Sequence, residues 1–599
     1  MTSQDHYIGI DVGTGSARAC IIDSAGEIKA LASEDIRMWQ PAHGHYEQST
    51  TDIWRAIAKC VRKILADSSV PPASVKGIGF DATCSLAVFT HDTDEPVAVT
   101  GPDFAHRPSS ENDKDLVRNV ILWLDHRPLA ETERINATGH RLLRYLGGTM
   151  NVEMETPKVL WLKNHMPPEL FRRCKFYDLA DALTHLAAGG ETRSFCSAVC
   201  KQGYVPVGVD GSVKGWQEDF LKEIGLGELV EDGFKRVGGV DGVNGQFLSA
   251  GELVGGLCEK AAADLGLPPG IAIGSGVIDA YAGWIGTVGA SVDLQHPTAT
   301  TRSPAEGVSQ AFTRLAAVAG TSTCHLAMSP SPVFVPGVWG PYRDVVIPDY
   351  WMSEGGQSAT GELLKHMIET HPAYPAARDD ASAAGQSIYD LLNAHLRQLQ
   401  LKENAPSMAY LARHLFFYGD LWGNRSPVAD PNMRGAIVGL GSDKGRDALA
   451  LVYYATMEFI ALQTRQIIET MNSSGHALSS IFLSGSQCQN DILVGLMATA
   501  CGMPVVVPEY VNAAVVHGAA MLGAKAASGK AGSDGKTEAL WEIMARMTRP
   551  GKVVWPREDG REKRLLQAKY EVFLDQCTRQ REYRQKVDEA LRELDEGGA

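Results

Sequence analysis

Two short loops combine glycine with hydroxyl residues directly after an apolar run, and both have the composition of a phosphate-binding loop. The first spans residues 11–16 (DVGTGS) and the second spans residues 320–323 (GTST). Glycine lets main-chain N–H groups approach an anion closely, and the hydroxyls supply further donors. Neither loop has the Gly-Lys-Ser/Thr of a P-loop or the spacing of a dinucleotide fingerprint. Either loop alone is more typical of an ordinary hairpin turn, but two in one chain favour a phosphorylated ligand.

Carboxylates at the ends of predicted strands supply the second part of this chemistry. Asp11, Asp81 and Asp125 each end an apolar run (IGID, GIGFD and LWLD). Because the strand ends of open α/β sheets form ligand clefts, we expect these three to face one cleft. Asp279 stands alone between an apolar run and a Gly/Ala-rich helical segment (GSGVIDAYAGWIG). Burying a lone carboxylate is costly, so we expect Asp279 to have a functional role.

Apolar periodicity and glycine turns place these residues in an α/β architecture. The first loop joins two strand-like runs as a hairpin, and residues 52–67 carry apolar side chains at helical spacing. Mixed helices and glycine loops fill residues 134–253, which we expect to shape a pocket of the first domain. Residues 314–330 (RLAAVAGTSTCHLAMSP) repeat the opening pattern of strand, Gly-Thr turn and strand. The second half is therefore predicted to be a diverged copy of the first.

Changes in composition divide the chain into three parts. A stretch rich in Thr, Ser, Pro and Ala at residues 297–306 indicates a boundary near residue 290, and the density of charge rises after about residue 536. We predict an N-terminal domain over residues 1–290, a C-terminal domain over residues 291–535 and a charged helical extension over residues 536–599.

Composition excludes several classes of partner. The 599 residues carry a formal net charge of −15, which argues against nucleic acid and anionic membrane as partners. The N-terminus has neither a basic leader nor an apolar core, and no apolar run approaches the length of a membrane span, so we expect a cytoplasmic protein. The 11 cysteines are scattered, and the closest pair, Cys196 and Cys200, lacks the further ligands of a zinc site.

Eight ordered segments of the chain resemble the FGGY family of carbohydrate kinases. They are IGIDVGTGSARA, GIGFDATCS, LWLDHR, PKVLWLKN, GSGVIDAYAG, AGTSTC, GGQSATGE and SGSQCQND, spread from about residue 7 to about residue 525. Within the family they look most similar to the ribulokinases. The resemblance implies two actin-like (ribonuclease H-like) α/β domains with ATP in the cleft between them. It also implies ATP-dependent phosphorylation of a ketopentose.

The resemblance assigns roles to individual residues. Asp11 would orient Mg²⁺ through water, and Asp279 would be the general base. Thr14, Arg18 and Thr321 would contact the ATP phosphates, with Arg18 acting in catalysis. The other positions implied to bind ATP are Gly13, Gly15, Ser16, Gly320, Ser322, Gly485, Gln487 and Asn490. The positions implied to bind sugar, besides Asp279, are Asp81, Cys84, Lys201 and Glu354.

Three of the implied sugar residues also have plain structural alternatives. Asp81 could cap a turn, because aspartate commonly accepts hydrogen bonds from its own backbone. Lys201 could be a solvated surface lysine, and Glu354 could be a carboxylate at the start of a helix. Two departures from the family pattern, EMET before PKVLWLKN and a longer gap after RGAIVGL, concern the subfamily more than catalysis.

The preferred acceptor implied by the resemblance is D-ribulose, because EMETPKVLWLKN and DATCS look closer to the D-ribulose kinases than to the L-ribulose kinases. Phosphorylation of L-ribulose, ribitol or xylulose is the nearest alternative. A rival from another class is a catalytically silent protein that binds ATP and sugar only to switch conformation. The joint presence of Asp11, Arg18 and Asp279 argues against that rival. The expected partners are the sugar and ATP, and the sequence permits a homodimer.

Overall fold

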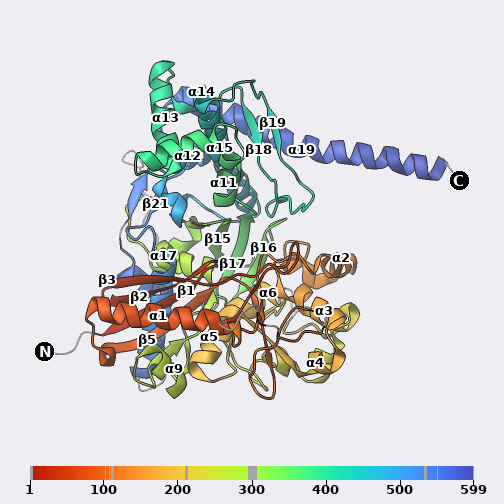
Figure 1. Ribbon diagram of the computed structural model, residues 1–599, viewed down its shortest axis with the longest axis vertical. Coiled ribbons are helices and arrows are strands. Elements are labelled where there is room, and N and C mark those ends of the chain that lie inside the picture. The colour runs from red at the N-terminus through yellow and green to blue at the C-terminus, as the bar shows by residue number, and fades with distance from the viewer. Residues whose placement is uncertain are drawn as a thin grey trace.

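The first sheet grows outward from an N-terminal hairpin. The computed structural model describes residues 5–101, 103–106, 108, 113–209, 214–294, 306–531, 536–549 and 551–597. β1 (His6–Val12) pairs antiparallel with β2 (Ser16–Asp23), which pairs antiparallel with β3 (Ile28–Asp35). On its other side β1 pairs parallel with β5 (Val75–Ala82), which is followed by β12 (Ala272–Gly274) and β11 (Leu253–Gly256). The short β13 (Val277–Ile278) also pairs with β5. We call the part built on this sheet the first lobe (Figure 1).

The second sheet repeats this order. β14 (Arg314–Ala319) pairs antiparallel with β15 (Thr323–Ser329), which pairs antiparallel with β17 (Trp351–Gln357). On its other side β14 pairs parallel with β20 (Ser480–Ser484), which is followed by β21 (Val505–Val507). β16 (Trp339–Arg343) and β22 (Lys552–Val554) form the two edges of this second lobe. The shared strand order confirms the prediction that the second half is a diverged copy of the first.

Helices cover both faces of the first sheet, which explains why β1 and β5 are buried at nearly every position. α1 (Thr50–Ser68) forms where apolar spacing predicts a helix and packs against β2 and β3, whereas α17 (Ala514–Ala531) packs against β1 and β5. Glycines permit a close approach of α17: a Cβ atom at Gly9 or at Gly79 would lie 2.0 Å from a main-chain oxygen of this helix. The strands and α17 are therefore fitted backbone to backbone.

The two lobes exchange helices. α17 lies late in the chain but packs on the first sheet, while α10 (Asp279–Val288) follows the strands of the first sheet and packs against β14 and β20 of the second. The two helices cross at small residues, since a Cβ atom at Gly518 would lie 2.0 Å from the carbonyl oxygen of Ala282. The boundary predicted near residue 290 thus follows a helix that touches both lobes, and residues 291–535 include a helix of the first lobe. Residues 297–305 of the predicted linker lie outside the described residues.

A four-stranded sheet and several helices are added to the first lobe. The sheet has the order β4 (Glu47–Gln48), β7 (Val120–Ile121), β6 (Leu86–Thr90) and β8 (Cys174–Asp178). α3 (Glu155–His165) and α5 (Leu179–Ala188) form where PKVLWLKNH and YDLADALTHLAAG predict helices, and α6 (Phe195–Lys201) follows them. This region carries Lys201, one residue of the site described below.

The prediction that Asp125 shares the strand-end cleft is wrong. Asp125 follows β7, which belongs to the four-stranded sheet, and the residue is fully buried. Its two carboxylate oxygens accept hydrogen bonds from Arg127 at 2.9 and 2.8 Å, and Arg127 also contacts Glu47 at 2.9 Å. In the sequence, LWLD looks like the runs that end in Asp11 and Asp81. In the structure, however, the Asp125 carboxylate is used in a buried ion pair.

The C-terminal segment contributes to both lobes. α18 (Leu540–Met547) packs against α17 and α10, and β22 completes the second sheet. α19 (Gly560–Gly597) begins against the second lobe, where Lys569 Nζ donates to the carbonyl oxygen of Ala412 at 2.7 Å, and then projects away from the body (Figure 1). The residues predicted as a charged helical extension therefore also include a strand and a packed helix. Among the described helices, none combines the length and apolar character needed to cross a membrane.

Candidate active site

Asp11 and Arg18 face each other at the end of the first hairpin. They are partners in the register of β1 and β2, and Arg18 Nη1 lies 3.8 Å from Asp11 Oδ2. The Arg18 side chain is 45% exposed, whereas that of Asp11 is 7% exposed. The hairpin therefore presents a solvent-accessible guanidinium directly beside a buried carboxylate.

Asp81 lies on the opposite side of Asp11, as its register partner on β5. Asp81 is fully buried, and neither of its carboxyl oxygens meets a hydrogen-bond donor from the described part of the protein. Burial, together with the charges of Asp11 and Asp279, raises the pKa of Asp81 well above its ordinary value. Burial also raises the pKa of Asp11, but the charge of Arg18 opposes this increase. Of the two adjacent carboxyls, Asp81 therefore favours the protonated form more strongly than Asp11 does.

Asp279 is the first residue of α10, the helix that touches both lobes. β13, which precedes it, pairs with β5 beside Asp81, so Asp279 begins close to the same strand ends. Its Oδ1 accepts a hydrogen bond from the Ala280 N–H at 2.7 Å. Burial and the charge of Asp11 raise the pKa of Asp279 to about 7. A carboxyl with this pKa exchanges its proton near neutral pH, as a general base must.

Lys201 and Glu354 form a buried ion pair between the lobes. Lys201 ends α6 of the first lobe and Glu354 lies in β17 of the second, yet Nζ and Oε1 are 2.9 Å apart and the side chains are 1% and 3% exposed. The Tyr281 hydroxyl of α10 donates to the other glutamate oxygen, Oε2, at 3.0 Å. Burial opposes the charge of Lys201, but the Glu354 carboxylate keeps the pKa of Lys201 raised well above its ordinary value. The surface-lysine and helix-start alternatives are therefore wrong.

The implied sugar residues divide into two groups. Cys84, between β5 and β6, is partly exposed, and burial raises the pKa of its thiol well above the ordinary value although the charge of Lys201 opposes this. It therefore lies near the Lys201–Glu354 pair as a neutral thiol. Asp81 instead lies beside Asp11, at the phosphate-loop end of the sheet. Whether either residue contacts sugar stays a prediction.

The first glycine loop is held as a tight turn that borders open space. The Gly13 N–H donates to the carbonyl oxygen of Ser16 at 3.0 Å. The Thr14 Oγ1 atom accepts a hydrogen bond from Trp123 Nε1 at 3.1 Å, which leaves its hydroxyl hydrogen for another acceptor. A Cβ atom at Gly15 would meet no atom within 4 Å. The loop is thus held in place by hydrogen bonds at Gly13 and Thr14, while Gly15 borders open space.

The second glycine loop shows the same arrangement in the other lobe. The Gly320 N–H donates to the carbonyl oxygen of Ser322 at 2.9 Å, and a Cβ atom at Gly320 would meet no atom within 4 Å. Thr321 is exposed, while its carbonyl oxygen accepts a hydrogen bond from the Thr360 N–H at 2.9 Å. The Thr321 hydroxyl is therefore placed on the accessible side of the loop.

Two of the positions implied to bind ATP, Gln487 and Gly485, support this second loop. Gln487 Nε2 donates to Thr360 Oγ1 at 2.6 Å and to the carbonyl oxygen of Gly320 at 3.2 Å. Gly485 has a φ of 91°, and a Cβ atom there would lie 2.1 Å from the carbonyl oxygen of Ala319. Glycine is therefore required at 485 for conformation and for space. Gln487 and Gly485 thus bring the end of β20 against the second glycine loop, a structural role that does not depend on any contact with a nucleotide.

Asn490 has a structural role at the start of α16 (Asp491–Cys501). Its Oδ1 atom accepts from the Leu493 N–H at 3.3 Å, and its Nδ2 atom donates to the Tyr453 hydroxyl at 2.7 Å. Both ends of the side-chain amide are thus used inside the protein. The predicted contact of Asn490 with ATP stays a prediction.

Sequence reasoning missed two polar residues of the site. Tyr281 links α10 to Glu354, and Thr360 links the second glycine loop to Gln487. Both lie inside segments that carry the family resemblance, IDAYAG and GGQSATGE. Their partners are far away in the sequence, so only position within those segments could have drawn attention to them.

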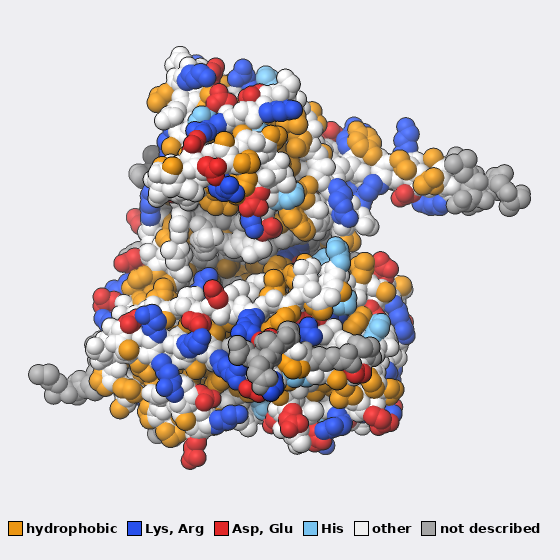
Figure 2. All heavy atoms as spheres, in the orientation of Figure 1, with side chains coloured by type: hydrophobic (Ala, Val, Ile, Leu, Met, Phe, Trp, Pro, Cys, Tyr) orange, Lys and Arg blue, Asp and Glu red, His pale blue; other side chains and the backbone are white. Residues whose placement is uncertain are grey.

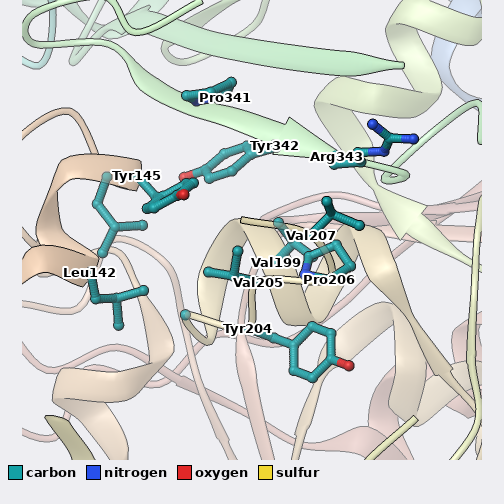
Figure 3. A pocket seen from close by; sticks show the side chains of 12 residues that line it. Leu142, Tyr145, Val199, Tyr204, Val205, Pro206, Val207, Pro341, Tyr342 and Arg343 are labelled. Atoms are coloured by element: carbon teal, nitrogen blue, oxygen red, sulfur yellow. The ribbon is translucent and has the colours of Figure 1, made fainter. Parts of the chain in front are cut away.

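The lobes meet behind the Lys201–Glu354 pair through a largely apolar contact. Figure 2 shows a hollow between the two lobes on the face that it draws. Val199 and Tyr204 from the region of α6 and Tyr342 from β16 line a small cavity between the lobes (Figure 3). Tyr342 also donates a hydrogen bond to the carbonyl oxygen of Cys200 at 3.4 Å. The pair is therefore backed by packed side chains.

One further cluster has the ligand types of a metal site. Asp94, His185 and Glu191 place one possible ligand atom each within 4.8 Å of one another. Lys175 Nζ lies against both carboxylates, at 2.8 Å from Glu191 Oε1. The lysine already neutralises this cluster, so it gives no support for a metal.

Two lobes of repeated topology, with phosphate-loop geometry in each and an aspartate of raised pKa between them, define a two-lobed phosphotransferase. Models of the FGGY family of carbohydrate kinases match residues 6–101 with its N-terminal domain and residues 315–527 with its C-terminal domain. The chain is 51% identical to a D-ribulokinase of Saccharomyces cerevisiae over 521 residues, which cover 87% of this chain and 72% of that protein. It is 41% identical to a human FGGY carbohydrate kinase domain-containing protein, over 96% of this chain and 97% of the human protein.

The chain therefore belongs to the FGGY family of carbohydrate kinases and is a phosphotransferase with an alcohol group as acceptor. Solved structures agree on the fold. A xylulose kinase from Rhodospirillum rubrum superposes with a TM-score of 0.70 at 18% identity, covering 96% of this chain and 99% of that one. A glycerol kinase from Plasmodium falciparum with ADP gives 0.68 at 16% identity, covering 96% and 98%. The predicted actin-like two-domain fold is thus confirmed.

Proposed function

We propose that the protein transfers the terminal phosphoryl group of ATP to a ketopentose, with D-ribulose as the preferred acceptor. The observation that carries the proposal is the position of Asp279, whose pKa is raised to about 7, at the start of the helix that touches both lobes. The 51% identical relative named as a D-ribulokinase supports the choice of sugar.

Asp279 would accept the proton of the acceptor hydroxyl as that oxygen attacks the γ-phosphorus of ATP. The bond between the γ-phosphorus and its bridging oxygen breaks, and ADP leaves with the electron pair, so that the products are a sugar phosphate and ADP. Charge that spreads over the transferring group would be stabilised by the Arg18 guanidinium and by the N–H and hydroxyl donors of the two glycine loops. Closure of the lobes would exclude water, which competes as an acceptor.

The residues present fit a magnesium ion at the end of the first hairpin. Asp11 is the carboxylate of this site, and both oxygens of the adjacent Asp81 lack a protein donor within the described residues, which leaves them able to accept hydrogen bonds from water. Oxygen ligands and retained waters are what Mg²⁺ prefers. Asp11 would hold the ion through water, and the bound ion would neutralise negative charge on the ATP phosphates.

The buried pair of Lys201 and Glu354 would orient the sugar. With Tyr281 and Asp279 it forms a polar patch at the junction of the lobes, so sugar hydroxyls would meet partners already fixed in direction. Such a patch discriminates between sugars, because a misplaced hydroxyl leaves a buried polar partner unpaired at about 1–3 kcal/mol. The other enzymatic candidates are kinases for L-ribulose, ribitol or xylulose.

The test is ADP production with D-ribulose, L-ribulose, xylulose and ribitol at saturating ATP. We expect kcat/KM to be highest for D-ribulose. A preference of about tenfold for another acceptor corresponds to about 1.4 kcal/mol in transition-state binding. It would overturn the assignment of D-ribulose as the substrate but not the assignment of the protein as a kinase. ATP and sugar binding without sugar-dependent ADP release would instead favour the catalytically silent switch protein.

A further inference from the structure

A second buried ion pair joins the two lobes. Glu153 precedes α3 in the first lobe, and Arg425 follows β18 (Phe416–Tyr418) in the second. Arg425 Nη2 lies 2.8 Å from Glu153 Oε1, and the side chains are 3% and 14% exposed, respectively. These residues are 272 positions apart in the chain. Because the pair is shielded from water, losing one member would leave the other charge without compensation.

The fold holds Arg425 in place from several directions. Its Nη1 atom lies 3.5 Å from Cys324 Sγ, and its guanidinium lies 5.5 Å from the centroid of the Trp339 ring. A Cβ atom at Gly356 would come 2.8 Å from Nη1, so glycine at this position of β17 leaves room for the guanidinium. Arg425 is thus seated against β15, β16 and β17 of the second lobe.

The same strands carry Glu354, the second-lobe member of the proposed sugar-orienting pair. Lys201 Nζ lies 4.4 Å from the centroid of the Trp339 ring, and Trp339 is the register partner of Glu354. Trp339 therefore has the cations of Lys201 and Arg425 as neighbours. On the side of the first lobe, the charge of Glu153 adds to burial in raising the pKa of Cys84. The Glu153–Arg425 pair and the Lys201–Glu354 pair consequently belong to one neighbourhood at the lobe junction.

We infer that Glu153 and Arg425 are positioning residues that clasp the lobes beside the sugar pocket and keep Glu354 of the second lobe against Lys201 of the first. The inference rests on the proposed function for its kinetic part, because the sugar is taken to bind at Lys201 and Glu354. Its structural part, the clasp between lobes, does not depend on the identity of any substrate.

The kinetic experiment compares Glu153→Gln, Arg425→Gln and the double variant with the wild type. We expect each single variant to lower kcat/KM for D-ribulose at least about tenfold, mainly through KM for the sugar, since its binding groups come from both lobes. The double variant should be no worse than the more damaged single variant, because residues that act as one unit are not additive. Unchanged sugar KM, or losses that multiply in the double variant, would overturn the clasp.

A matched control is available on the same loop of the second lobe. Asp430 pairs with Arg584, also of the second lobe, and shares a bridge with Asn424, the neighbour of Arg425. Asp430→Asn breaks an ion pair without touching the lobe junction. We expect its sugar KM to stay within about twofold of the wild type. A tenfold increase in this control would show that the loop, not the clasp, sets the kinetics, and would overturn the inference.

Small-angle X-ray scattering separates failure of the clasp from failure of the proposed function. Without sugar, Glu153→Gln and Arg425→Gln should have a larger radius of gyration than the wild type and than Asp430→Asn. If the wild type phosphorylates no sugar, the proposed function fails, and the scattering alone decides the clasp. Equal radii in all four proteins would overturn it.

Discussion

The two hairpins hold corresponding places in the two sheets but differ in charge. In the first lobe, the central strand, its antiparallel partner and its parallel partner place Asp11, Arg18 and Asp81 in one row. In the second lobe the corresponding row is uncharged and consists of Val318, Cys324 and Ser484. The repeated backbone thus gives two loops able to hold phosphate, while the charged groups are confined to one of them.

This asymmetry suits a reaction with one transferred group. Under the proposed function, the charged row of the first lobe would hold a metal ion and a cation near the ATP phosphates, and the neutral loop of the second lobe would close on them without adding charge. Asp279 directly follows β13, which pairs with β5 of the first lobe, and it begins α10, which packs against β14 and β20 of the second lobe. The proposed base is therefore placed where the charged and neutral halves meet.

The largest expected effect comes from Asp279→Asn, which removes the proton acceptor between the two hairpins. We expect kcat to fall by about 10²- to 10⁴-fold, the usual contribution of a general base, while sugar binding and the melting temperature change little. Steady-state ADP release and a thermal melt measure these quantities. A folded variant with kcat within tenfold of the wild type would remove Asp279 from this role.

Arg18→Ala removes the cation of the charged row and should lower kcat by about 10²-fold, comparable to the loss of one donor to developing charge. KM for the sugar should change little, because the proposed function places Arg18 beside the ATP phosphates and not beside the sugar. Arg18→Lys serves as the control and should recover part of the rate. An increase in sugar KM with normal kcat would place Arg18 in the sugar pocket instead.

The pH dependence of the wild type should report the raised pKa of Asp279, which is about 7. The base works only when ionised, so kcat/KM should fall about tenfold per pH unit below about pH 7 and level off above it. The profile is measured with D-ribulose at subsaturating concentration. A rate independent of pH between about 5 and about 7, which is roughly the two pH units below the expected midpoint, would contradict the assignment.

The smallest expected effect is that of Asp81→Asn. Because burial and the neighbouring carboxylates raise the pKa of Asp81 and so favour its protonated form, the neutral amide resembles that side chain, and kcat at pH 7 should stay within about threefold. Asp11→Asn, next to it in register, should cost much more and raise the Mg²⁺ requirement. Ser484→Ala, at the place corresponding to Asp81 in the second lobe, should also have little effect. Equal large losses in Asp11→Asn and Asp81→Asn would show that both act as anions.

The features of the fold that depend on local sequence pattern could be predicted. The hairpins, the two glycine loops, α1, α3 and α5 follow from apolar spacing and turn residues, and the duplication follows from the repeated pattern. The helix exchange of α10 and α17 could not be predicted, because it depends on glycine contacts between segments more than 200 residues apart in the chain.

Only part of the candidate site could be predicted, because some of its contacts join residues that are far apart in the chain. Asp11, Arg18 and Asp279 lie in segments with recognisable local character. The ion pair of Lys201 with Glu354 joins residues 153 positions apart, and each residue alone has an ordinary surface explanation. For Asp125 the local pattern predicted a place in the cleft, but the carboxylate forms a buried ion pair with Arg127 instead.

The central claim is that the junction of the charged and neutral hairpins transfers phosphate to a ketopentose. It is tested most directly by measuring ADP release from Mg-ATP with and without D-ribulose, with ³¹P NMR of the product. The account predicts that D-ribulose raises ADP release at least about 10²-fold above basal hydrolysis, the lower range of general-base catalysis, with one sugar phosphate formed per ADP. ADP release that is unchanged by D-ribulose and by the other pentoses and pentitols, in protein that binds ATP, would contradict it.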